Sequence, residues 1–289
     1  MTQDTVTTLS SDVLRRSKGA VVSDTDTLLV FYQGTLLSGE QFDANFDFTN
    51  FEPVPGRQAF EFILGAGQVI EGWDKGLVGQ RVGSVIELTI PADQAYGEAG
   101  SGDRIPPNSP LMFKVEVLAM LPAGSSEPIF SDYKDLGINT EKIGLTEELI
   151  DSTTGLKIGL DGADSIQGGK QADLLIGLKG KDQLTGGRGA DVLLGGKSKD
   201  TFQYLSVKES PAVEGKSDHL LDFGRRDKID LQELGDELQF IGRDPFSGTA
   251  GDLRFSAGRL ELDQDGDGSA DFALLMPGTK TLKATNLIL

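Results

Sequence analysis

Two groups of aspartates have side chains and a spacing that could hold a hard cation. One group recurs every nine residues, at Asp164, Asp173, Asp182, Asp191 and Asp200. The other follows the order D-x-D-x-D-G-x-x-D, at Asp263, Asp265, Asp267 and Asp271. Carboxylate oxygens are the ligands that Ca²⁺ prefers, and alternate carboxylates on a tight loop converge on one ion. For the second group an aspartate-rich hairpin turn is an equal alternative, because Leu274 stands where an EF-hand has its glutamate.

The composition argues against several other kinds of metal or catalytic site. The chain of 289 residues has no cysteine and one histidine, His219, so thiolate metal sites, histidine triads and multi-histidine zinc sites are not expected. We expect His219 to lie on the surface or to contact the end of a domain. The net charge of −18 argues against nucleic acid and favours cations as partners. No apolar run approaches the length of a membrane span.

A second candidate site is apolar and centres on residues 59–73, AFEFILGAGQVIEGW. Phe60 and Phe62 alternate with a polar residue, which predicts a half-buried strand, and a short helix is expected from about Glu71. This helix carries Trp73, the chain's single tryptophan. The tryptophan is either the centre of a core or the floor of an apolar cup.

The elements that must position this tryptophan are mainly strands. We expect strands within residues 27–43, at 60–64, 84–90 and 111–118, with the helix at 72–78. Many strands and one short helix predict an antiparallel sheet wrapped on that helix, an α+β domain at residues 24–121. Residues 1–23 are expected to form a tail or a short edge strand.

The motifs of this region resemble those of the FKBP family of peptidyl-prolyl cis/trans isomerases. They occur in family order, as Y-x-G from Tyr32, G-x-x-F-D from Gly39, F-x-F-x-L-G from Phe60, V-I-x-G-W-D from Val69, G-x-x-x-G from Gly79, I-P from Ile90, A-Y-G from Ala95 and I-P-P-N from Ile105. The resemblance implies catalysed rotation about X–Pro bonds in proline-containing polypeptides, with no cofactor. It implies a pocket with Trp73 as its floor and apolar walls from Tyr32, Phe42, Phe60, Val69, Ile70, Ile105 and Phe113. Asp43 and Tyr96 would supply its polar contacts, together with the Ile70 backbone N–H.

The sequence departs from the family pattern in three places, none of which removes a pocket wall. Ser101 stands where many members have a larger ring, Ala59 replaces a proline, and the loop 44–58 is longer and adds Phe46, Phe48 and Phe51. These phenylalanines are expected to pack the loop rather than to form a second binding surface. Asp43 has an alternative role as a turn-capping residue after a strand.

Residues 159–203 consist of five consecutive nonapeptides. Each begins with glycine, has aspartate at position 6 and an apolar residue at position 8, namely Ile166, Leu175, Leu184, Leu193 and Phe202. The pattern resembles the RTX (hemolysin-type) repeat, which implies an all-β parallel β-roll that binds calcium. Two nonapeptides would make one coil, so the ions would lie between aspartates 18 residues apart. Six lysines or arginines at positions 3 and 5 should weaken such sites, and a calcium-independent roll is the alternative.

The remaining segments are a connector and a cap. Residues 122–158 begin with PAGSSEP and are expected to be a linker. Residues 204–289 resemble the cap that follows the repeats in serralysin-type C-terminal domains and hold a possible secretion signal. Repeats of this kind imply type I secretion or a cell-surface location, and the N-terminus lacks the apolar region of a Sec signal; a cytoplasmic location is the alternative. The sequence thus predicts a secreted isomerase on a calcium module. The alternative is a non-catalytic chaperone or surface-binding protein.

Overall fold

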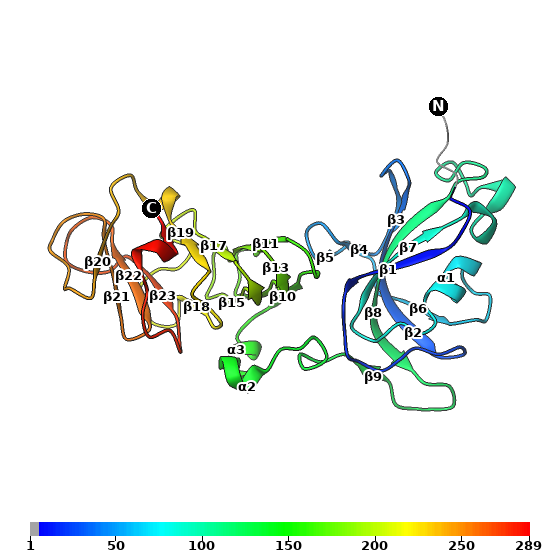
Figure 1. Cartoon of the computed structure of the whole chain (residues 1–289), viewed down its shortest axis with the longest axis horizontal. Coiled ribbons are helices and arrows are strands. Elements are labelled where there is room, and N and C mark those ends of the chain that lie inside the picture. Colours follow the sequence, from blue (N-terminus) through cyan, green and yellow to red (C-terminus); the bar gives the residue numbers. More distant parts are fainter. Residues whose placement is uncertain (1–5) are drawn as a thin grey trace. The chain divides into compact units, whose positions relative to one another are not determined.

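The computed structural model describes residues 6–289 and contains two compact units, Met1–Ile138 and Asn139–Leu289 (Figure 1). Each unit buries its own apolar core. Within the described residues, no helix is long and apolar enough to cross a membrane. The first five residues of the expected N-terminal tail lie outside the described part of the chain.

The first unit is an antiparallel sheet with few helices. Its strands are β1 (Ser10–Arg15), β2 (Thr27–Leu36), β3 (Gln41–Ala44), β4 (Phe46–Asp47), β5 (Glu52–Pro53), β6 (Phe60–Ile63), β7 (Val85–Ile90), β8 (Leu111–Leu121) and β9 (Ile129–Phe130). Its helical segments are α1 (Glu71–Gly76), η1 (Ala92–Gln94) and η2 (Gly97–Ala99). The main sheet has the order β1-β7-β8-β2-β3, while β6 pairs with β2 and β9 with β8. The antiparallel α+β arrangement expected from the sequence is confirmed.

Helix α1 lies directly on this sheet because two of its residues have no side chain. A Cβ atom on Gly72 would lie 2.4 Å from Cγ2 of Ile90, and one on Gly76 would lie 2.7 Å from Cδ2 of Leu88. Both contacts are with β7, so the helix approaches that strand closely. This approach buries Trp73, which is 4% exposed, against the core face of the sheet.

The segments at either end of the first unit are more ordered than a tail and a linker. Residues 10–15 form β1, which pairs with β7 at the edge of the sheet, so this part of residues 1–23 is the short edge strand. Its Arg15 is buried, donates to the Gly83 carbonyl and forms an ion pair with Glu116. Such pairing fixes a polar segment that has little apolar patterning of its own.

The expected linker 122–158 is divided between the two units. Strand β9 within it pairs with β8 of the first unit, and the boundary falls after Ile138. The rest holds α2 (Thr140–Ile143), α3 (Glu147–Asp151) and β10 (Gly155–Ile158). Asn139 and Thr146 cap the two helices with their side chains. Strand β10 pairs in parallel with β12 (Asp173–Ile176), so residues 155–158 belong to the repeat coil and not to a linker.

The inserted loop 44–58 packs on the sheet through its phenylalanines, as expected. Phe46, Phe48 and Phe51 are all buried. The Phe46 ring stacks on Phe31 of β2, with centroids 4.7 Å apart, and also contacts Phe48. Because Phe31 and Tyr32 alternate along β2, the loop covers the sheet face opposite the one that carries Tyr32.

The second unit is β-rich. Its strands are β10 (Gly155–Ile158), β11 (Ser165–Gln167), β12 (Asp173–Ile176), β13 (Lys179–Gly180), β14 (Gln183–Thr185), β15 (Val192–Leu194), β16 (Lys197–Ser198), β17 (Thr201–Gln203), β18 (Asp218–Leu220), β19 (Lys228–Asp230), β20 (Gln239–Gly242), β21 (Asp252–Ser256), β22 (Arg259–Asp263), β23 (Phe272–Leu275) and β24 (Leu287–Ile288). Two 3₁₀ turns are η3 (Gln232–Leu234) and η4 (Ala284–Asn286). The longer sheet has the order β10-β12-β15-β18-β23-β22-β21-β20, and the other β11-β14-β17-β19-β24.

Short parallel strands stack side chains of the same repeat position in both sheets. In one sheet Ile166, Leu184, Phe202, Ile229 and Leu287 pair successively, and in the other Leu175, Leu193 and Leu220 do so. These side chains are buried. Residues that pair in adjacent coils are 18 positions apart in the sequence, as Gly155 with Asp173 and Ser165 with Gln183.

The glycine-rich turns between these strands accept some non-glycine residues at a conformational cost. Ser198 has φ 112° and Leu178 has φ 72°, both in the region that favours glycine. Ser198 stands at position 4 of its repeat, where three of the five repeats have glycine. Gln171, at the equivalent position of another repeat, is not among the residues with positive φ and avoids this cost.

Candidate active site and acidic ladder

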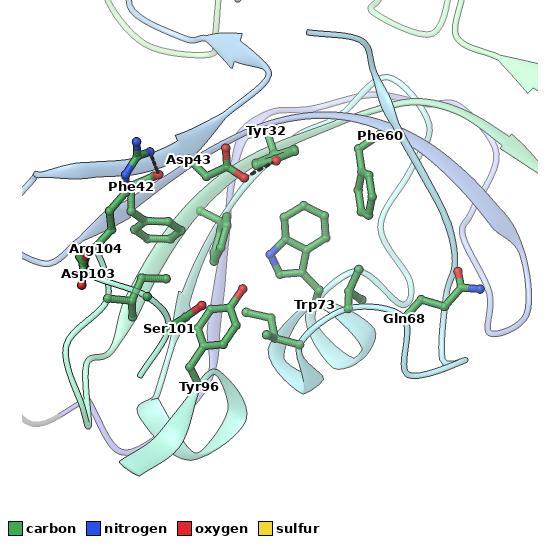
Figure 2. Close-up of a pocket in the computed structure, with 15 residues that line it drawn as sticks. Tyr32, Phe42, Asp43, Phe60, Gln68, Trp73, Tyr96, Ser101, Asp103 and Arg104 are labelled. Carbon is green, nitrogen blue, oxygen red and sulfur yellow. Dashed lines mark hydrogen bonds between the residues drawn. The ribbon is translucent and has the colours of Figure 1, made fainter. Parts of the chain in front are cut away.

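An aromatic cavity of about 620 Å³ opens in the first unit. All ten residues predicted for the apolar site line it, namely Tyr32, Phe42, Asp43, Phe60, Val69, Ile70, Trp73, Tyr96, Ile105 and Phe113. They come from β2, β3, β6, α1 and its preceding loop, the turns after β7, and β8. Figure 2 shows Tyr32, Phe60 and Tyr96 around the Trp73 indole.

The Trp73 indole is held at the bottom of the cavity by aromatic neighbours. Its ring centroid lies 5.2 Å from that of Phe113 and 5.5 Å from that of Tyr32, both in edge-to-face geometry. The Nε1 atom is buried and has no hydrogen-bond partner among the described residues. Trp73 therefore belongs to the core cluster and to the cavity wall at once, so the two roles considered for it are compatible.

Glycine at position 34 allows two of the aromatic walls to meet. A Cβ atom there would lie 2.7 Å from Cε1 of Phe113 and 2.7 Å from Cζ of Phe42. The two phenylalanine rings are themselves in edge-to-face contact, 5.4 Å apart. In the Y-x-G motif, the Tyr32 ring thus faces the cavity, and Gly34 leaves space for the rings of Phe42 and Phe113.

Asp43 lies at the cavity wall, and three donors fix it. The Tyr32 hydroxyl donates to Oδ2 at 2.7 Å, and Arg57 Nη2 donates to Oδ1 at 2.6 Å. The backbone N–H of Ala44 also donates to Oδ1. Burial, and then the bond to Asp43, raise the pKa of the Tyr32 hydroxyl, so Tyr32 remains protonated as the donor. Asp43 therefore lies at the cavity wall and also accepts a local capping bond from the Ala44 N–H.

The rim of the cavity includes residues that the sequence analysis did not assign to it. Gln68, Gly102, Asp103 and Arg104 line the cavity, as does Ser101, which was noted as a departure. Arg104 donates to the Phe42 carbonyl at 2.8 Å, which ties the loop after η2 to β3. Arg57 was also missed, because it lies in the long inserted loop, 14 residues from its partner Asp43.

The loop that carries Val69 and Ile70 is attached by two polar side chains. Gln68 Oε1 accepts the Ile63 N–H at 2.8 Å, and the Gln68 side chain points away from the indole (Figure 2). Asp74 of α1 accepts the N–H groups of Gly65 and Gly67. These bonds hold the backbone that places Ile70, the N-cap residue of α1, at the cavity wall.

In the second unit the repeat aspartates form a ladder along each edge of the coil. The N–H of Asp164 donates to Oδ1 of Asp182, that of Asp173 to Asp191, and that of Asp182 to Asp200. These are the three pairs predicted from the repeat, 18 residues apart. The ladder continues beyond the repeats, since the N–H of Asp191 donates to Asp218 and that of Asp200 to Asp227, each 27 residues away.

The second oxygen of several ladder aspartates is buried without a hydrogen bond. Within the described residues this applies to Oδ2 of Asp182, Asp191 and Asp200. Burial raises the pKa of Asp182 and Asp191 to about 7 and that of Asp200 to about 6. A buried carboxylate without a counter-charge is costly, so the donor set fits a hard cation that would neutralise it.

The hairpin between β22 and β23 brings together three of its four predicted aspartates. One carboxylate oxygen each from Asp263, Asp265 and Asp267 lies within 4.8 Å of the others. Asp263 is buried and accepts the N–H groups of Gly266 and Gly268. Asp271 instead accepts the N–H of Gln264. Both readings of this motif, an ion loop and a self-bonded hairpin turn, are consistent with these contacts. His219 is half-buried on β18, within the cap region.

Comparison with known proteins agrees with this division. Residues 19–118 match the FKBP-type peptidyl-prolyl cis-trans isomerase family, and residues 129–289, more than half of the chain, match the serralysin C-terminal family of M10 peptidases. FK506-binding protein 1 from Dictyostelium discoideum is 39% identical over 106 residues, which are 37% of this chain and 92% of that protein. The chain belongs to both families, one through each unit.

Other relatives of the FKBP-type unit are covered less completely. FK506-binding protein 2 from Dictyostelium discoideum is 45% identical over 95 residues, 33% of this chain and 65% of that protein. The solved structure of FkpA from Escherichia coli is 40% identical, with 42% of this chain and 52% of that chain covered and a TM-score of 0.35. The chain spans less than two thirds of the length of these two proteins.

Proposed function

We propose that the first unit catalyses cis/trans isomerisation of X–Pro bonds in proline-containing polypeptides. The observation that carries this proposal is the open aromatic cavity around Trp73, lined by all ten residues assigned from the FKBP motifs. An apolar floor with the fixed carboxylate of Asp43 at the wall is suited to a proline ring and its flanking carbonyls.

The reaction needs shape and low polarity more than reactive groups. Amide resonance sets a barrier of about 18–20 kcal/mol to rotation. In the half-rotated state the nitrogen loses conjugation, so the imide is less polar than in either planar state. A dry aromatic cavity therefore stabilises the half-rotated state more than the ground states, which is the condition for catalysis. The Tyr96 hydroxyl and the Ile70 N–H would hold substrate carbonyls, and Tyr32 and Arg57 keep Asp43 in position.

An exchange measurement on a short X–Pro peptide tests this proposal. Two-dimensional NMR exchange reports the isomerisation rate without a coupling protease. The variant Asp43→Ala with Tyr96→Phe should lose most of the acceleration shown by the unchanged protein. Asp12→Ala with Tyr133→Phe removes the same groups at positions that do not line the cavity and should keep full activity. Equal, uncatalysed rates for every protein would leave a non-catalytic chaperone or surface-binding role.

We infer that the second unit is a calcium-binding β-roll that supports export or stability. The parallel 18-residue coil, the aspartate ladders and the unsatisfied Oδ2 atoms support this inference. Asp164, Asp173, Asp182, Asp191 and Asp200 would hold ions between successive turns, and Asp263, Asp265 and Asp267, with Asp271 beside them, are candidates for a separate site. The core of the coil is one side chain thick, so bound calcium would add stability that burial alone supplies poorly.

Calcium removal tests the second part separately. Far-UV circular dichroism and thermal unfolding, followed in calcium, in magnesium and after chelation, should show a calcium-specific stabilisation. The same transition in Mg²⁺ and in chelator as in Ca²⁺ would exclude it. We further propose that the protein leaves the cell by type I secretion, with the coil folding in extracellular calcium. Its recovery only from the cytosol of a cell with an intact type I exporter would contradict that route.

A further inference from the structure

Six cationic side chains lie on one row of turns of the parallel coil. We call this row the basic ridge, and it consists of Lys179, Lys181, Lys197, Lys199, Arg225 and Arg226. All six residues are exposed. They come from three consecutive turns on the same edge of the coil, residues 177–182, 195–200 and 222–227.

Backbone pairing fixes the spacing of the basic ridge. Strands β13 and β16 pair in parallel with Lys179 opposite Lys197. The aspartates that follow Lys181, Lys199 and Arg226 are joined in sequence by N–H bonds to carboxylates at 3.1 Å. Adjacent parallel strands lie about 4.8 Å apart. The cations therefore repeat along the coil at about that interval.

The ridge is largely unpaired. Lys179 forms an ion pair with Asp161 at 2.5 Å. For Lys181, Lys197, Lys199, Arg225 and Arg226, no ion pair with a carboxylate is found within residues 6–289. A chain with a net charge of −18 thus presents a local strip of positive charge.

The acidic groups beneath the ridge are engaged with the backbone. Asp222 accepts the N–H groups of Gly195 and Gly196, and Asp227 accepts those of Gly224 and Asp200. Asp182 and Asp200 are buried. At the last of the three turns the surface is hollowed, with Lys197, Arg225 and Arg226 among the lining residues of a cleft of about 790 Å³. The cations are exposed, while Asp222 and Asp227, which line the same cleft, have both carboxylate oxygens bonded to backbone N–H groups.

The opposite row of turns lacks this arrangement. Its three corresponding turns, residues 168–173, 186–191 and 213–218, carry one cation each, against two in each ridge turn. These cations are Lys170, Arg188 and Lys216. The concentration of charge is thus specific to one edge of the coil and is not a general property of the repeats.

We propose that the basic ridge binds a linear acidic polysaccharide, with carboxylate or sulfate groups along its sugar chain. A polymer with about one anionic group per sugar has a charge interval comparable to the strand spacing of about 4.8 Å. Nucleic acid fits less well, because turns 177–182 and 195–200 contain no aromatic residue on which bases could stack, and Phe223 of turn 222–227 packs against Phe202.

Binding of dextran derivatives to the full chain tests this proposal. The probes are dextran sulfate, carboxymethyl dextran and neutral dextran, at one fixed calcium concentration and low ionic strength, with Kd measured by biolayer interferometry. Both charged polymers should bind and neutral dextran should not. Each cation near an anionic surface contributes about 1 kcal/mol, or about fivefold in affinity, so removing three should weaken binding on the order of 100-fold.

The ridge variant is Lys181→Gln with Lys199→Gln and Arg226→Gln, which removes three stacked charges and leaves the Lys179–Asp161 pair intact. The control, Lys170→Gln with Arg188→Gln, removes charge from the opposite row and should leave the Kd unchanged. Circular dichroism checks the fold of each variant. A salt titration of the unchanged protein tests whether binding is electrostatic and requires no substitution. Equal losses in both variants, salt-independent binding, or tighter binding of single-stranded DNA at equal charge concentration would overturn the proposal.

Discussion

Replacing Gly34 by alanine should disturb the cavity directly, because its added Cβ atom would lie 2.7 Å from atoms of both Phe42 and Phe113. The favourable separation of carbon atoms is about 3.5 Å or more, so each ring must retreat by about 0.8 Å. Overpacking of this kind costs about 1–3 kcal/mol. Alanine in a strand regains about 0.5–1 kcal/mol of backbone entropy, which leaves a net destabilisation of up to about 2.5 kcal/mol.

The effect of Gly34→Ala on isomerisation should be larger than its effect on stability. Both displaced rings belong to the cavity wall. A displacement approaching 1 Å in a positioning group can lower a rate by roughly 10- to 100-fold. NMR exchange on an X–Pro peptide gives the rate, and urea unfolding gives the free energy. Gly162→Ala is the matched control, since nothing lies within 4 Å of its added Cβ. A Gly34→Ala variant that is stable and fully active would refute the argument that these rings must keep their places.

Three further predictions follow from contacts described above. Tyr32→Phe removes the donor to Asp43 Oδ2 while Arg57 remains, so kcat/KM should fall by about fivefold, equivalent to about 1 kcal/mol, and an unchanged value would show that this bond has no role. Phe202→Ala empties a fully buried place in the coil and should cost about 3–5 kcal/mol in urea unfolding; a cost below about 1 kcal/mol would contradict the packing described. The pKa values of Asp182 and Asp191 in the folded protein are raised from 3.8 to about 7, so the calcium-free protein is stabilised at low pH, where both are protonated. This stability is lost as the pH rises from about 4 through 7. The melting temperature in calcium-free buffer should therefore fall between pH 5 and pH 8, and a rise would contradict the assignment.

The cavity could be assigned from the sequence because its residues occur in short, ordered motifs with unusual chemistry. Tyr32, Trp73 and Tyr96 are far apart in the chain, yet each lies in a motif that resembles the FKBP family. Arg57 could not be found in this way, because its role depends on how the long loop 44–58 folds back toward β3. The edge strand β1 was also weakly indicated, since its sequence SSDVLR has little alternation and is held by pairing with β7.

The aspartate ladder could also be predicted only in part from the sequence. Five aspartates were recognised because a glycine precedes each by five residues. Asp218 and Asp227 are also nine residues apart, and each is followed two residues later by a buried apolar side chain, Leu220 or Ile229. They were not counted as repeats because their turns lack the glycine pattern and the step from the preceding rung is 27 residues. The two-residue spacing from each aspartate to an apolar residue was the pattern that would have indicated Asp218 and Asp227.

The stack that begins at Ile166 is completed by Leu287, which pairs beside Ile229 although 58 residues separate them. Until residues 287–288 pair with β19, that side of the strand has no neighbour. This pairing therefore closes a longer loop than the 18-residue steps between repeats, and we expect it to form more slowly than they do.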